Sequence, residues 1–227
     1  MGAFKRFAFI SFLTIAVVLS AYAAKQFVMP RALPAAQYPA HDSHPNEKVT
    51  IAADPYDYHE KQKDLFVGDY LEHSLLPVFI VVTNDGDQPL SLTEIKMELL
   101  TRDRAKAAAC NDSDLYRRFT KTKRYEDKST GARKIPYPIP LPKGDQGAVK
   151  KELREEFDAS QFFAKAVEPH GTQSGFVFFD IGGLDNPANG ATLTITGVKD
   201  GDGNPMMYFE VSFDKYVSAP RTSSAFH

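Results

Sequence analysis

The chain of 227 residues contains no tryptophan and a single cysteine, Cys110. One thiol cannot form an internal disulfide, so the fold cannot depend on the disulfide framework that stabilises many small secreted domains. We expect Cys110 to be an unpaired loop residue, and a disulfide to another chain is the alternative. The formal net charge is only −2, so no excess of basic residues points to a nucleic-acid partner.

The sequence also lacks a complete motif for catalysis or metal binding. The stretch His59–Lys63, HEKQK, begins like the zinc-protease motif H-E-x-x-H but has lysine in place of the second imidazole. In GTQSG, residues 171–175, the serine stands one place too late for a nucleophile elbow. His41 and His44 form at most an incomplete metal site. These absences predict a non-enzymatic protein with no catalytic residues, no cofactor and no metal site.

The N-terminus carries the features of an export signal. Lys5 and Arg6 precede 18 uncharged residues, Phe7–Ala24, and AYA near the end of this run is a small-x-small cleavage pattern. We therefore predict a signal peptide over residues 1–23. The alternative is an uncleaved membrane anchor, because 18 residues lie at the short end of the range for a transmembrane helix. Both interpretations place the rest of the chain in the periplasm or outside the cell.

Alternating apolar residues predict β-strands in the rest of the chain. The stretch Ser74–Asn84 is almost continuously apolar, which is typical of a central strand buried on both faces. Near the C-terminus, Met207, Phe209, Val211 and Phe213 occupy every second position, which predicts a half-buried strand. Six or seven such strands, without long helices between them, favour an all-β protein.

A hairpin is expected to follow the central strand. A turn at Asn84–Asp87 would connect Ser74–Asn84 to a second strand within residues 90–100. The alternation of that second strand slips once between Leu92 and Ile95, and one slip predicts a β-bulge.

The middle of the chain differs from both ends. Residues 102–169 are predicted to be a long insertion of loops with one or two short helices. Val149, Leu153 and Phe157 have the spacing of one helical face, and Ser160 is a candidate cap for a further turn.

The strand pattern predicts an immunoglobulin-like antiparallel β-sandwich with this insertion and an N-terminal signal segment. Its expected parts are a signal peptide, a proline-rich linker, one sandwich domain and a frayed tail, over residues 1–23, 24–46, 47–218 and 219–227. The stretches LLPVFIVVTNDGDQPLSL, GFVFFDIGGL and GVKDGDGNPMMYFEVSF make the chain similar to exported bacterial immunoglobulin-like domains of uncharacterised function. The resemblance concerns structural motifs, so it implies an architecture and no activity.

A short glycine-rich stretch has two interpretations. Asp200, Asp202 and Asn204 have the i, i+2, i+4 spacing of a calcium loop. An EF-hand also needs glycine at its sixth position and glutamate at its twelfth, and Pro205 and Val211 stand there instead. The stretch therefore predicts a hairpin turn, with an isolated weak calcium site as the alternative.

The most distinctive stretch is Leu115–Lys134, in which eight basic residues outnumber two acidic ones and aromatic residues are interleaved. Outside the cytoplasm, the available polyanions are lipid head groups, lipopolysaccharide and acidic glycans. The stretch predicts a polyanion-binding surface, and a solvated loop of mixed charge is the alternative. The residues predicted to form this surface are Arg117, Arg118, Lys121, Lys123 and Arg124.

Together these features predict a non-enzymatic, exported binding or assembly module of the bacterial cell envelope. Its partner would be an envelope protein or an anionic glycan or lipid, with no nucleic acid, and the membrane would be met only through an uncleaved N-terminal segment. The alternative is an envelope hydrolase with a site built from loops. The candidate groups for that hydrolase are His59, His73, His170, Asp180 and Asp185.

Overall fold

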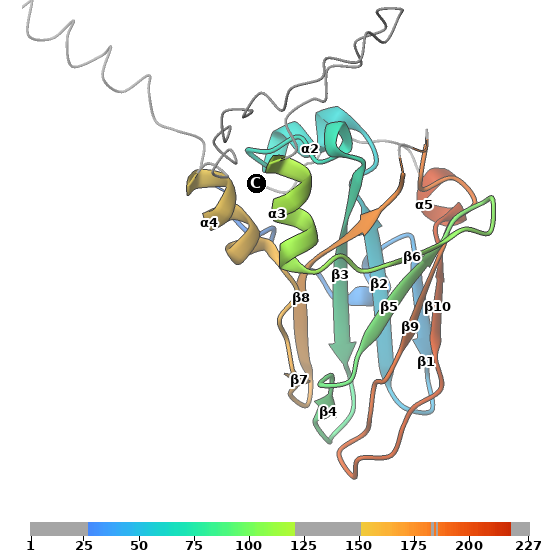
Figure 1. The fold of residues 1–227 in the computed structure, drawn as a ribbon. Helices are drawn as coiled ribbons and strands as arrows, with labels where there is room; N and C mark the ends of the chain where they lie inside the picture. Colours follow the sequence, from blue (N-terminus) through green and yellow to red (C-terminus); the bar gives the residue numbers. More distant parts are fainter. Residues whose placement is uncertain (1–26, 121–150, 183, 185, 219–227) are drawn as a thin grey trace, which may run out of the picture.

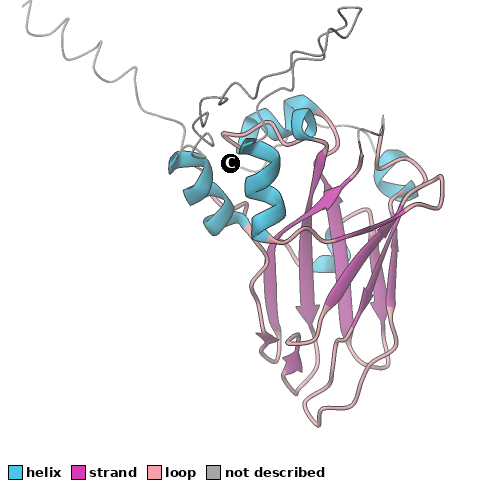
Figure 2. Ribbon diagram, viewed as in Figure 1, coloured by secondary structure: helices cyan, strands magenta, loops and turns pink. Residues whose placement is uncertain are grey.

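The computed structural model describes residues 27–120, 151–182, 184 and 186–218. In this part of the chain the structure is mainly β, as predicted, with its strands paired in antiparallel sheets. Figure 1 and Figure 2 show the strands running along the body and the helices gathered mostly at one end of it.

The first sheet has the strand order β1-β2-β3-β8. Its strands are β1 (His41–His44), β2 (Val49–Pro55), β3 (Leu75–Asn84) and β8 (Gly171–Asp180). All ten residues of β3 are buried, and β3 pairs along its length with β8 on one side and with β2 on the other. The prediction of a central strand at Ser74–Asn84 is confirmed.

The second sheet has the strand order β10-β9-β5-β6. Its strands are β5 (Lys96–Leu100), β6 (Lys106–Ala108), β9 (Thr192–Thr196) and β10 (Phe209–Ser212). A small separate pair joins β4 (Leu90–Ser91) to β7 (Ala166–Val167). The two larger sheets share one apolar core, which includes buried side chains of β2, β3 and β8 from the first sheet and of β5, β9 and β10 from the second.

The helices are short. They are η2 (Ala35–Gln37), α2 (His59–Leu65), η3 (Leu71–His73), α3 (Asp112–Thr120), α4 (Lys151–Ser160) and α5 (Asp214–Ser218). We call the end of the body at which α2, α3, α4 and α5 lie the helical end (Figure 1). Leu153 and Phe157 face inward from α4, as their helical spacing predicted.

The predicted C-terminal strand is present but starts later than expected. Phe209, Val211 and Phe213 are fully buried, whereas the side chain of Met207 is 70% exposed. Phe209 pairs with Ile195, so Met207 would lie opposite Gly197 if the pairing continued. The chain turns away at Gly197, whose φ is +81°, and the pairing ends before Met207.

The predicted hairpin between β3 and β5 is wrong, because the two strands belong to different sheets. The chain leaves β3 through a turn organised by the buried side chain of Asn84. Its Nδ2 donates to the carbonyl of Gln88 at 2.7 Å, and its Oδ1 accepts from the amide of Gly86 at 2.9 Å. The slip between Leu92 and Ile95 is likewise a turn between β4 and β5, closed by a backbone bond of 3.1 Å, and no bulge.

The first sheet is buried on both faces. Its outer face, away from the second sheet, carries a cluster of aromatic side chains that we call the aromatic layer. The layer consists of Phe27, Tyr38, Tyr56, Phe66, Tyr70, Phe79, Tyr116, Phe119, Phe157, Phe176 and Phe178. Some of these side chains belong to the sheet itself, and others come from helices α3 and α4 and the segment 27–38, which pack over the sheet. This second buried face explains why β3 has no polar alternation.

The linker prediction for residues 24–46 is corrected over the described part of that range. Ala35 is fully buried, and its amide donates to Thr83 Oγ1 at 2.9 Å. Residues 41–44 form β1, which extends the first sheet beside β2. The apolar side chains of this segment cover the aromatic layer.

A second correction concerns the end of α4. The expected further helical turn after Ser160 is absent, because α4 ends at Ser160 and the chain then runs beside β8. The amide of Phe162 donates to the carbonyl of Phe176 at 2.9 Å. Gly175 permits this approach, since a Cβ there would lie 2.6 Å from Cα of Phe162 and 2.8 Å from its amide nitrogen.

We predict that Gly175→Ala lowers the free energy of unfolding by about 1–3 kcal/mol, because the new methyl group meets backbone that cannot move independently. Gln173→Ala, at an exposed position of the same strand, should change it by less than about 0.5 kcal/mol. Urea denaturation of the two variants measures both values. Equal stabilities would show that the chain does not pack this closely on β8.

Candidate binding surface at the helical end

Helices α3 and α4 are held on the first sheet by aromatic contacts. The ring of Phe157, on α4, makes edge contacts with Tyr116 and Phe119 of α3 at centroid distances of 5.4 and 5.3 Å. It also contacts Tyr70 at 5.5 Å and Phe178 of β8 at 6.0 Å. Edge-to-face pairs of this kind stabilise packing beyond the area they bury. One fully buried ring therefore joins both helices to the sheet.

A buried carboxylate fixes the loop beneath α4. Glu156 is 2% exposed, and it accepts hydrogen bonds from the amide of Val67, from the amide of Gly68 at 3.2 Å and from the hydroxyl of Tyr70 at 2.7 Å. Burial, and then the nearby Glu156 carboxylate, raise the pKa of Tyr70 well above its ordinary value. Three hydrogen-bond donors offset the cost of burying this carboxylate away from water. Glu156 therefore acts as a tie between α4 and residues 67–70.

Gln62 holds the same loop from the other side. This side chain is 1% exposed; its Nε2 donates to the carbonyl of Tyr56 at 2.7 Å, and its Oε1 accepts from the amide of Tyr70 at 3.0 Å. Tyr70 is thus fixed through its amide by α2 and through its hydroxyl by α4. Sequence analysis did not identify either polar residue, because a buried Gln or Glu in a short helix looks like any solvated one.

Two of the five predicted polyanion-binding residues lie on α3, and both are in ion pairs. Arg117 pairs with Asp114 on the same helix at 3.0 Å, and Arg118 pairs with Asp180 at the end of β8. Successive residues on a helix point about 100° apart, so the two guanidinium groups serve different faces. Lys121, Lys123 and Arg124 lie outside the described residues. The ion pair of Arg118 ties α3 to the end of β8.

A second cluster of charges lies where α2 meets α5. Lys61 Nζ donates to Asp54 at 2.6 Å and to the carbonyl of Pro55 at 2.8 Å, and it lies over the rings of Tyr56 and Tyr216. Tyr216 in turn donates to a carboxylate oxygen of the neighbouring Asp57 at 2.7 Å. The donors of Lys61 are satisfied within the protein, so this cluster attaches α5 to the body.

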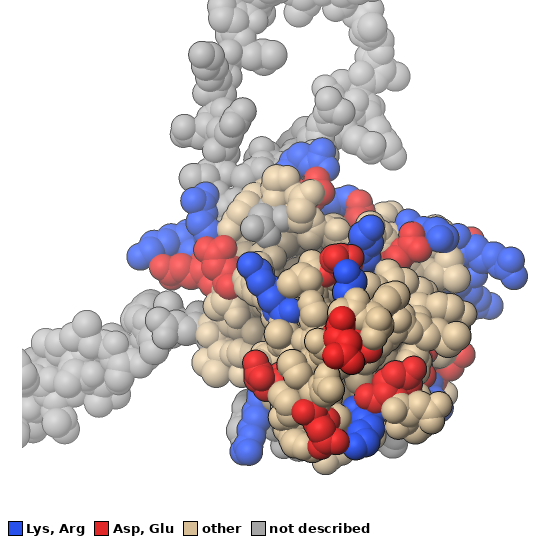
Figure 3. Space-filling view, turned by 90° about the horizontal axis from the view of Figure 1, so that it is seen from below, with Lys and Arg blue, Asp and Glu red and all other residues tan. Residues whose placement is uncertain are grey.

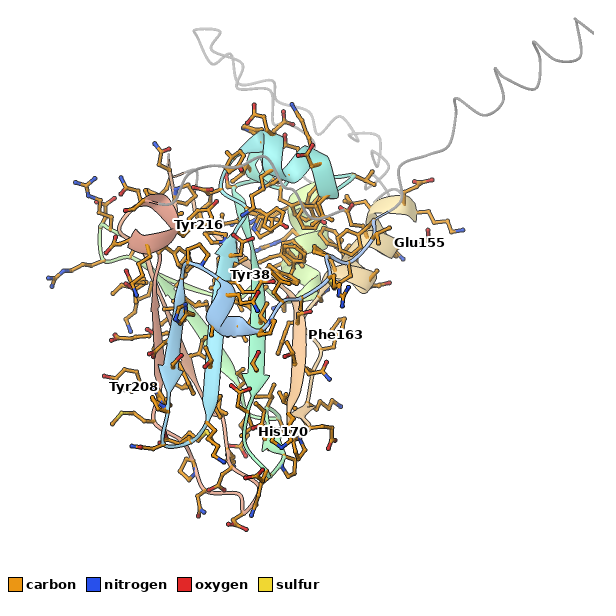
Figure 4. All side chains as sticks on the ribbon, turned by 180° about the vertical axis from the view of Figure 1, so that it is seen from behind. Tyr38, Glu155, Phe163, His170, Tyr208 and Tyr216 are labelled. Carbon is orange, nitrogen blue, oxygen red and sulfur yellow. The ribbon has the colours of Figure 1, made fainter. Side chains whose placement is uncertain are left out.

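Of the three histidines considered for a hydrolase, two lie at the helical end and the third lies at the opposite end. His59 pairs with Asp69 at 2.8 Å beside α2, and the ring of His73 lies 4.0 Å from that of Phe119. His170 lies at the opposite end, 3.3 Å from Asp87 (Figure 4). Asp180 is in the ion pair with Arg118, and Asp185 lies outside the described residues. The described candidates therefore do not all belong to one site, because His170 lies at the other end of the body.

His41 and His44 do not face a common ligand. Residues three apart in a strand point to opposite faces, and β1 places them so. His41 Nδ1 is 2.7 Å from the carbonyl of Tyr38, while the ring of His44 stacks on that of Phe209 at 3.9 Å. In residues 27–120, 151–182, 184 and 186–218, no group of three or more His, Cys, Asp or Glu side chains is placed to hold a metal ion.

The stretch 200–204 is a turn, as expected. One carboxylate oxygen of Asp200 accepts from the amides of Asp202 and Asn204, at 3.0 and 2.8 Å, and the other accepts from Asn204 Nδ2 at 3.1 Å. Lys199 forms a bridge with Pro205 across the turn. The carboxylate that a calcium ion would need is thus engaged by the turn itself.

The end that carries this turn, opposite the helical end, has interspersed charges (Figure 3). Lys48 pairs with Asp87 at 3.1 Å, and Lys199 pairs with Glu94 at 2.6 Å. Such exposed pairs contribute little to stability. The face offers no field of one sign that would attract a polyanion.

Comparison of the chain with protein-family models, with curated proteins and with solved structures found no match. Among the described residues, no helix has the length and apolar content required to cross a membrane. Function is therefore inferred from the sites and from the sequence.

We predict that Glu156→Gln lowers the free energy of unfolding by about 1–3 kcal/mol, because an amide cannot accept from all three donors and places its own NH₂ against them. Glu155→Gln, on the exposed side of the same helix, should cost less than about 1 kcal/mol. Thermal and urea unfolding measure both. An equal loss in the two variants would mean that Glu156 does not hold the loop.

We also predict that the carboxyl of Asp200 titrates below its ordinary pKa of 3.8, chiefly because Asn204 Nδ2 donates to its charged form. A lowered folded-state pKa stabilises the turn above the ordinary value, and this stabilisation is lost as the pH falls through the folded-state pKa. Carboxyl NMR titration should show Asn204→Ala returning the pKa towards 3.8 and Met207→Ala leaving it unchanged. An unchanged pKa in Asn204→Ala would contradict the turn geometry.

Proposed function

We propose that the protein is a non-enzymatic, exported module of the bacterial cell envelope that binds a polyanion through the basic segment between α3 and α4. The observation that supports this most is the anchoring of both ends of that segment. Phe157, Glu156 and the ion pair of Arg118 with Asp180 fix the two helices on the sheet. A segment whose ends are held in place needs to lose less freedom when it binds.

The charge of the segment supports an anionic partner. Residues 121–150 contain eight basic and three acidic residues, among them Lys121, Lys123 and Arg124. Arg117 and Arg118, by contrast, are already paired with carboxylates of the protein. The proposed binding charge therefore lies between the helices rather than on α3. Anionic lipid head groups and acidic glycans are polyanions that an exported protein meets.

The strand order supports an immunoglobulin-like β-sandwich for the body. Without β1, β4 and β7, seven strands remain, which in chain order are β2, β3, β5, β6, β8, β9 and β10. The first, second and fifth of them lie in one sheet. The other sheet has the order seventh, sixth, third, fourth. Immunoglobulin domains whose fourth strand pairs with the third, as in variable-type domains, have the same order in their two sheets, and this likeness supports the proposed architecture. The proposed architecture serves as a rigid support for the segment.

A binding role also fits the dispersed titratable groups. His59 and His73 make separate contacts at the helical end, and His170 lies at the other end. A hydrolase would need such groups within hydrogen-bonding reach of one substrate. We therefore favour binding over catalysis.

Replacement of Lys121, Lys123 and Arg124 by Gln should weaken co-sedimentation of the chain without residues 1–23 with phosphatidylglycerol vesicles or with an acidic polysaccharide. The binding that remains should fall further as salt is added, since screening weakens charge attraction. The two ligands separate a lipid partner from a glycan partner.

The matched control replaces Lys48, Lys96 and Lys199 by Gln, which removes the same charge from the opposite end of the molecule. This control should bind as the unmodified chain does. The proposal fails if both triple variants bind equally well, or if neither polyanion is bound at low salt.

A further inference from the structure

The described part of the chain begins on the surface of the body, at Phe27. Phe27, the first described residue, stacks on Phe66 with ring centroids 5.6 Å apart and planes 13° apart, and it makes an edge contact with Phe176 of β8. Only Lys25 and Gln26 separate it from the apolar run Phe7–Ala24. The three residue steps from Ala24 to Phe27 span at most about 11 Å.

If the run Phe7–Ala24 stays in a membrane, it is barely long enough to cross the hydrocarbon core. An 18-residue helix is about 27 Å long, against a hydrocarbon core of about 30 Å. The end of the run at Ala24 would then lie at the edge of the hydrocarbon core or within it. With a tether of two residues, the surface around Phe27 must be within reach of the lipid head groups.

The surface at this point is suited to such contact. Val28 follows Phe27 and is 73% exposed, and Val67 follows Phe66 and is 45% exposed. The two valines therefore flank the stacked rings. Val67 is also held rigidly, because its amide donates to Glu156 and a Cβ on the adjacent Gly68 would lie 2.7 Å from Leu153. Val28 and Val67 are two of the five large hydrophobic residues that are exposed in the described part of the chain.

We propose that, in the form of the protein that keeps residues 1–26, the face formed by Phe27, Val28 and Val67 lies against the lipid bilayer. The tether makes this contact intramolecular, so a small apolar patch is enough to orient the body. Lys25 then lies among the head groups, where a cation is favoured. Helices α3 and α4 lie at the same end of the body (Figure 1), so the segment between them starts and ends near the membrane.

This inference deepens the proposed function, because it makes the lipid surface the partner, but its test does not depend on the basic segment. The chain has no tryptophan, so a single one reports its own surroundings. The full chain carrying Val67→Trp is reconstituted in vesicles of phosphatidylethanolamine and phosphatidylglycerol at a ratio of three to one. Tyr208→Trp, at a position 51% exposed beside β10 (Figure 4), is the matched control.

The tryptophan at position 67 should emit at shorter wavelength in vesicles than the one at position 208, and lipids with brominated chains should quench it strongly. Quenching of both positions to the same extent would overturn the proposal. So would a blue shift at position 67 that grows with protein concentration in detergent, because a second copy would then cover the face.

Determination of the N-terminal residue of the natural protein tests whether residues 1–26 are kept. An N-terminus at Ala24 would show that the tether is removed, and the proposal would fall while the proposed polyanion binding stood. Loss of co-sedimentation in the lysine and arginine variants, with the signal at position 67 retained, would leave both proposals in place.

Discussion

The structure depends on the burial of β3 on both faces. Every residue of this strand is buried, so the first sheet needs an apolar layer on each side. The second sheet provides one layer, and the aromatic layer beneath α3, α4 and residues 27–38 provides the other. Residues 27–38 and both ends of the insertion are therefore parts of the folded body. Their positions follow from the need to cover Phe79, Phe176 and Phe178, which alternate to the outer face.

Polar groups at the helical end give these coverings definite positions. Apolar contact alone is not directional, whereas a buried carboxylate that accepts three hydrogen bonds sets both the place and the orientation of α4. Glu156 and Gln62 together fix Tyr70, and the pair of Arg118 with Asp180 fixes α3. Arg118, which the sequence predicted to bind a polyanion, thus contributes to the fold through its ion pair. The proposed binding role passes to the segment between the helices and to the face around Phe27.

Sequence reasoning succeeded where one local pattern determined the result. The apolar run of β3, the alternation of Phe209 with Val211, and the helical spacing within α4 all had that property. It failed where a distant partner decided. The hairpin between β3 and β5 was expected because they are neighbours in sequence, but the turn at Asn84 directs the chain to the other sheet. Residues 27–46 looked like a linker because their prolines were visible and their packing on the aromatic layer was not. The ties formed by Glu156 join positions almost ninety residues apart and leave no local signature.

The central claim is that the aromatic layer is a second core that folds together with the first sheet. Native-state hydrogen exchange tests it most directly, because several amides of the outer layer donate to defined acceptors. The amides of Gly68, Cys110 and Phe162 bond to Glu156, Phe178 and Phe176. We expect them to exchange with protection close to that of the β3 amides, through the same global opening. Rapid exchange of these amides while β3 stays protected would show that the helices and their loop are only loosely attached, and would contradict the account.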